Sequence, residues 1–129
     1  EAFFQTQPVV GTLLGNVYFR KYKLQYNPRI FFCPPSRKAI HAILVHEFEH
    51  INDYYESSAV ELLGFATRYN VFSKFRKNYE RETDKKACAK GQAEGLIEYR
   101  EWIYDKLTPK QLESKKAQYL TPEELRKYL

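Results

Sequence analysis

Apolar residues follow two different spacings along this chain, and the change comes near residue 34. Before it they form short runs rich in β-branched and aromatic side chains, broken by glycines and by the turn signal Asn27-Pro28. Such runs are typical of strands separated by turns. We predict strand character over residues 9–23 and 29–33 after a short lead-in, and therefore a small N-terminal sheet of two or three strands.

The spacing becomes helical after Pro34 and Pro35. Ser36 is a favourable N-cap, and no glycine or proline interrupts residues 37–57. Apolar side chains recur in this segment three or four positions apart, which predicts a long helix with one buried face. The residues expected on that face are Ile40, Ile43, Leu44, Phe48 and Ile51.

The rest of the chain also reads as helix, over residues 59–72, 73–90 and 93–107, with Gly91 as a C-cap. Two Thr-Pro pairs, at Thr108 and Thr121, are each followed by a capping-box Gln or Glu and should start two short helices. We expect an α+β fold in a single domain, residues 1–129. The small sheet would pack on the long helix and on a helical C-terminal body.

Charge and cysteine content narrow the function classes. The net charge of +5 favours a nucleic-acid partner, but the basic residues are dispersed among 13 glutamates without a dense run. We therefore expect a solvated surface and no nucleic acid. No apolar stretch is long enough to span a membrane, and two cysteines cannot form a disulfide framework. We expect a cytoplasmic protein without membrane contact.

The candidate chemistry lies in the long helix, in the HExxH sequence of residues 46–50. His46 and His50 are four positions apart, so both imidazoles can face one metal ion. Glu47 can reach a water bound to that ion and take its proton, which is the arrangement of a zinc metallopeptidase. His41, about 140° round the helix from His46, cannot face the same ion.

A third ligand must therefore be Glu, Asp or Cys. Glu80 and Asp84 are four apart on a predicted helix and share one face. Either carboxylate can bind the metal while the other accepts a hydrogen bond from a ligand histidine. Glu82 competes with Glu80, but it lies about 200° away round the helix, so only one of them can face the ion.

Together, HExxH and the later ExxxD resemble the signature of the gluzincin metallopeptidases. Because the chain has no membrane helices, it is more similar to the minigluzincins, small archaeal proteins, than to the membrane-embedded peptidases of that group. The resemblance covers about residues 28–91. Thr83 departs from the alanine usual in that family. The resemblance implies that His46, His50 and Glu80 bind zinc, that Glu47 is the catalytic base and acid, and that Asp84 orients a ligand histidine.

The resemblance also implies a substrate-binding rim and a latent form. The rim would be the strand before the long helix, where a peptide or protein substrate adds as a further strand. The residues of that strand are Arg29, Ile30, Phe31, Phe32 and Cys33. Segment 108–129 would cover the cleft and keep the enzyme as a zymogen, pack on the body, or form a dimer contact. The sequence leaves open whether the chain forms a homo-oligomer.

Less specific interpretations compete with the peptidase. The two histidines could be ordinary core residues, and Glu80 and Asp84 could belong to a solvated charged face. A zinc-binding interaction protein without catalysis is the main alternative function. The presence of Glu47 favours the enzyme, because a structural zinc site needs no base.

Overall fold

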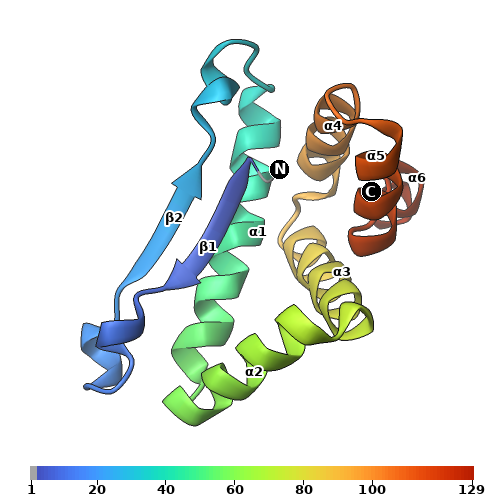
Figure 1. Ribbon diagram of the computed structural model, residues 1–129. Helices are drawn as coiled ribbons and strands as arrows, with labels where there is room; N and C mark the ends of the chain where they lie inside the picture. The colour runs from blue at the N-terminus through green and yellow to red at the C-terminus, as the bar shows by residue number, and fades with distance from the viewer. Residues whose placement is uncertain (1–2) are drawn as a thin grey trace.

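Helix α1 (Arg37–Glu56) runs through the middle of the molecule, between a two-stranded hairpin and the other helices (Figure 1). This computed structural model describes residues 3–129. The fold is α+β, as the sequence predicts. Its other elements are β1 (Phe4–Pro8), β2 (Tyr22–Tyr26), α2 (Ala59–Val71), α3 (Ser73–Ala89), α4 (Ala93–Tyr104), α5 (Pro109–Gln118) and α6 (Pro122–Leu125).

The sheet is an antiparallel pair, with Phe4 opposite Tyr26 and Pro8 opposite Tyr22. The expected lead-in is thus strand β1, and most of the segment predicted as strand before Tyr22 is not strand. Two 3-10 turns, Val10–Thr12 and Val17–Phe19, occupy that segment. Asn16 accounts for the second turn, because its side chain accepts a hydrogen bond from the Tyr18 amide and caps it.

The strand predicted at 29–33 is also wrong, because Pro28–Phe31 forms a 3-10 helix. The Asn27 side chain accepts a hydrogen bond from the Arg29 amide at 3.0 Å, and Pro28 fixes the first turn. Ile30 is buried in the core. Phe31 and Phe32 are 72% and 88% exposed, so the aromatic run that suggested a strand lies at the surface.

Helix α1 buries a different face from the one that its large apolar residues predict. Phe48 is 51% exposed, and Ile40, Leu44 and Ile51 are only half-buried. The buried face instead carries small residues, Ile43, the motif residues and Tyr54; its members are Ala39, Ala42, Ile43, His46, Glu47, Glu49, His50 and Tyr54. The face that packs on α3 and α4 is therefore the face that carries the chemistry.

The predicted helix ends are largely confirmed. Ser36 caps α1 by accepting from the Ala39 amide, and complete capping boxes start α5 at Thr108 and α6 at Thr121. Gly91 ends α3 with φ of 80°, a conformation that favours glycine. None of the helices within residues 3–129 has the length and apolar character needed to cross a membrane.

The C-terminal segment is part of the core. Leu120 and Leu125 are buried with Ala42 of α1, Ala87 of α3 and Leu96 of α4 in one apolar cluster. Residues 108–129 therefore complete the packing of α1, α3 and α4. Deleting them would remove core side chains along with any covering of the cleft.

Helices α1 and α4 approach each other closely at Gly95. A Cβ at this position would lie 2.6 Å from both the Ala42 Cβ and the Lys38 carbonyl oxygen, too close for either atom. We predict that Gly95→Ala lowers the free energy of unfolding by about 1–3 kcal/mol, the usual result of overpacking. Urea unfolding followed by circular dichroism measures the change.

Gly64 provides the matched control. It lies within α2, and a Cβ there meets nothing within 4 Å. Gly64→Ala should be neutral or raise stability by up to about 1 kcal/mol, because alanine is the better helix former. Equal effects of the two substitutions would contradict the close helix contact.

Candidate metal centre

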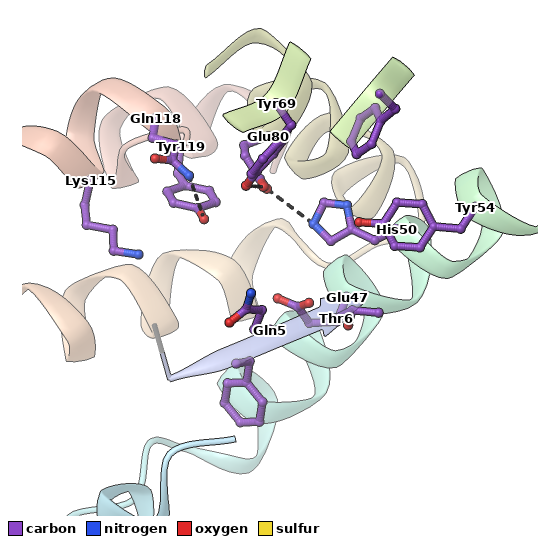
Figure 2. A pocket seen from close by; sticks show the side chains of 12 residues that line it. Gln5, Thr6, Glu47, His50, Tyr54, Tyr69, Glu80, Lys115, Gln118 and Tyr119 are labelled. Atoms are coloured by element: carbon purple, nitrogen blue, oxygen red, sulfur yellow. Dashed lines mark hydrogen bonds and ion pairs between the residues drawn. The ribbon is translucent and has the colours of Figure 1, made fainter. Parts of the chain in front are cut away.

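Three buried side chains converge between α1 and α3. Oxygen Oε2 of Glu80 lies 3.2 Å from Nε2 of His46 and 3.3 Å from Nε2 of His50. All three ligand atoms lie within 4.8 Å of one another. Figure 2 shows the contact between His50 and Glu80 as a dashed line. This group can hold a metal ion, because each side chain offers one donor atom to the same point.

The buried carboxylate of Asp84 contacts the ring nitrogen of His46 that faces away from Glu80. Oδ1 of Asp84 lies 2.8 Å from Nδ1 of His46, opposite the nitrogen that faces Glu80. The same carboxylate accepts from the Arg100 guanidinium at 2.9 and 3.0 Å and from the Leu120 amide at 2.9 Å. With the Asp84 carboxylate this close to Nδ1, we assign the His46 proton to Nδ1, which leaves the Nε2 lone pair for a metal ion.

His50 is oriented by a separate chain of hydrogen bonds. Its Nδ1 lies 3.0 Å from the Tyr79 hydroxyl, which donates to Oδ2 of Asp53 at 3.0 Å. Lys86 pairs with the other oxygen of Asp53. The Tyr79 proton is used on Asp53, so its oxygen accepts from His50 Nδ1–H. We therefore assign the Nε2 lone pair of His50 to the metal position as well.

The electrostatics of the group favour a positive charge at the imidazole of His46. Burial opposes charge on His46, but hydrogen bonds and the negative charges of Asp84 and Glu80 outweigh it and raise the His46 pKa to about 10. Burial raises the pKa of Glu80, yet the two histidines hold it well below its usual range. A field that favours a proton here also favours a metal cation.

Glu47 brings a carboxylate to the same pocket without a partner of its own. It is buried, and within residues 3–129 no group forms a hydrogen bond with its buried Oε2 atom. A buried carboxylate oxygen without a donor is costly, and a catalytic role or a bound water or ion is among the explanations for such a group. This oxygen is suited to hold a water that is bound to the metal, so the residues present fit a catalytic ion.

The pocket around these groups has a volume of about 250 Å³. Strand β1 and helices α1, α2, α3 and α5 all contribute to its walls (Figure 2). Its lining residues are Phe4, Gln5, Thr6, Glu47, His50, Tyr54, Phe65, Tyr69, Glu80, Lys115, Gln118 and Tyr119. The pocket is thus a site shared by elements from both ends of the chain.

The structure distinguishes between the candidate ligands. It brings Glu80 to the histidines, whereas Glu82 is exposed and pairs with Lys85. His41 is exposed on α1 beside Gln92, away from the group. Cys88 is a free, buried core residue and Cys33 a free, exposed one. Neither cysteine lines the pocket.

The predicted rim residues do not reach the site. Among residues 3–129, the pocket wall includes none of Arg29, Ile30, Phe31, Phe32 and Cys33. Their backbone turns away as a 3-10 helix, and the Cys33 carbonyl accepts a hydrogen bond from Trp102 instead. Strand β1, expected to be a lead-in, occupies the place beside Glu47.

Sequence reasoning missed the residues that support the ligands. Arg100 had a readable signal, because it lies three or four positions from Leu96, Ile97 and Ile103, on the apolar face of α4. No signal in the sequence points to Tyr69 or Tyr79. Tyr69 donates a hydrogen bond to Oε1 of Glu80. Tyrosine is common in this chain, and only the fold shows which of its hydroxyl groups meet the site.

Comparison of the chain with protein-family models, curated proteins and solved structures gave no match in any of the three. The site therefore rests on its own geometry. The site is a candidate metal centre because it combines the buried group of His46, His50 and Glu80 with the unpaired carboxylate oxygen of Glu47.

We predict that Glu80→Gln weakens the binding of a divalent metal such as Co²⁺. Loss of a residue that hydrogen-bonds to a metal ligand costs roughly 10- to 100-fold in affinity, and the loss here should be larger. The reason is the loss of one of three ligands and of its charge. Titration followed by visible absorption, with a competing chelator, measures the affinity.

Glu82→Gln is the control on the same helix, and its affinity should equal that of the unchanged protein. Circular dichroism of both variants checks that α3 still folds. Equal affinity in the two variants would remove Glu80 from the ligand set.

Proposed function

We propose that this protein is a zinc-dependent peptidase that hydrolyses peptide bonds with Glu47 as the base. The observation that carries the proposal is the buried, unpaired Oε2 of Glu47, in the pocket that His50 and Glu80 line. A site that only held a metal for stability would not need this carboxylate.

The donor set supports zinc as the metal. Two imidazoles and one carboxylate form a common catalytic zinc set that leaves a fourth position open for water or substrate. The resemblance to minigluzincins supports the same assignment. It is part of the proposal, and its motifs are HExxH and ExxxD within about residues 28–91.

In the proposed reaction, His46, His50 and Glu80 hold the ion. When bound, zinc supplies Lewis acidity that lowers the pKa of water and polarises the scissile carbonyl group. Glu47 Oε2 takes a proton from the attacking water and delivers it to the leaving amine. Asp84 and Tyr79 keep the two imidazoles in the orientation that this requires.

Tyr119 is a suitable donor to the carbonyl oxygen as negative charge develops there. Burial, followed by the nearby charge of Glu80, raises its pKa well above the usual value, so the hydroxyl keeps its proton. Its oxygen accepts from the Gln118 amide at 3.1 Å, which leaves the proton itself to be donated.

We propose that the substrate lies along β1 in place of the rim predicted at residues 29–33. Strand β1 pairs with β2 on one side, and no described strand pairs with its other edge. Its residues Phe4, Gln5 and Thr6 line the pocket beside Glu47. An extended peptide added to this edge would bring its backbone to the metal position.

Latency stays a prediction. Lys115 and Gln118 of helix α5 and Tyr119, the residue that follows the helix, contribute to the pocket wall, which supports a covering role for segment 108–129. The same segment supplies core residues, which supports plain packing. Hydrolysis by the intact, zinc-loaded chain would contradict a zymogen.

We predict that Glu47→Gln lowers kcat for peptide hydrolysis by about 100- to 10,000-fold, the usual contribution of a general base. The zinc content should stay near one ion per chain, because no ligand changes. Hydrolysis of a mixed peptide library, followed by mass spectrometry, and elemental analysis of zinc give the two readouts.

Glu56→Gln, at the exposed end of α1, is the control and should keep both zinc and activity. Zinc binding without hydrolysis in the unchanged protein would favour the alternative, a zinc-binding interaction protein. Absence of zinc after reconstitution would contradict both functions.

A further inference from the structure

Lys115 is the one residue of the pocket whose charge the reaction above does not use. It lies on α5 and lines the pocket together with Glu47 and Glu80. Figure 2 shows it entering from α5, on the side away from Tyr54. A ligand that reaches the metal position from that side passes its ammonium group.

Its ammonium group has no carboxylate partner within the part of the chain that the structure describes. Lys85, Lys86 and Lys90 each form an ion pair with an acidic side chain. The Nζ atom of Lys115 lies instead 5.0 Å from the centre of the Tyr119 ring. An ammonium that is half-buried beside an aromatic ring still lacks an anion.

The surroundings leave a positive charge to be balanced. Burial lowers the pKa of Lys115, as does the charge of Arg100, while Glu80 and Glu47 raise it. The Arg100 charge is already matched by Asp84. Once a divalent ion neutralises Glu47 and Glu80, the charge of Lys115 remains in excess. The pocket is then suited to an anionic ligand.

We propose that Lys115 is a specificity-determining residue that binds a carboxylate of the peptide substrate. This inference rests on the proposed peptidase function and names its substrate class. The carboxylate would be anchored at α5 while the peptide bond lies at the metal centre. Its source is either the free C-terminus of the peptide or an Asp or Glu side chain, since both present the same group to an ammonium.

The test compares three N-acetylated tetrapeptides with the zinc-loaded protein. The first is tetra-alanine with a free C-terminus, and the second is its C-terminal amide. The third is the amide with one alanine replaced by glutamate, made at each position in turn. Calorimetry in the Glu47→Gln background measures binding without hydrolysis, and the protein with Glu47 intact is assayed for cleavage of the same peptides.

Lys115→Met removes the charge and keeps an unbranched side chain only one atom shorter. Lys115→Arg keeps the charge, and Lys110→Met is the matched control on the exposed start of the same helix. We expect a carboxylate-bearing peptide to bind about 10-fold or more tightly than the plain amide, as a hydrogen bond to a charged group allows. The preference should disappear in Lys115→Met and persist in the other two variants.

The peptide that shows the preference identifies the source of the carboxylate. Equal binding of all peptides by the unchanged protein, or a preference that survives Lys115→Met, would overturn the inference. A Lys115-dependent preference without cleavage would support it while contradicting the peptidase function. Cleavage without any preference would support the function and overturn the inference.

Discussion

The structure depends on the contacts that the buried carboxylate of Asp84 makes. This carboxylate lies on α3 and joins Nδ1 of His46 on α1, the guanidinium of Arg100 on α4 and the amide of Leu120 near the end of the chain. Without this carboxylate, each of the three groups would stay buried and would lose its charged partner. Breaking such a pair commonly costs about 3–5 kcal/mol, because a charge stays buried without its counterion.

This arrangement makes the metal site part of the core. The face of α1 that packs on α3 and α4 carries both histidines. Gly95 and Ala42 let α4 approach α1 closely, and Arg100 of α4 bonds to Asp84 of α3. The Arg100 guanidinium also lies 4.6 Å from the ring centre of Tyr119, on the pocket wall. Folding of segment 108–129 and orientation of a metal ligand are therefore coupled.

Much of the fold and of the ligand group follows from sequence, because both depend on local spacing. Helix ends at Ser36 and Gly91 and the pairing of His46 with His50 are set by nearby residues. The N-terminal third is less predictable, since asparagine side chains converted apparent strands into 3-10 turns. Arg100 and Tyr79 reach the site only through tertiary packing, which no single segment encodes.

The most direct test of the central claim is anomalous diffraction at the zinc absorption edge from crystals of the intact protein grown with zinc. The account predicts one strong peak about 2.0–2.2 Å from Nε2 of His46, Nε2 of His50 and an oxygen of Glu80. The Asp84 carboxylate should remain on Nδ1 of His46, outside the ligand set. Zinc bound only elsewhere, or no peak between the two histidines, would contradict the account.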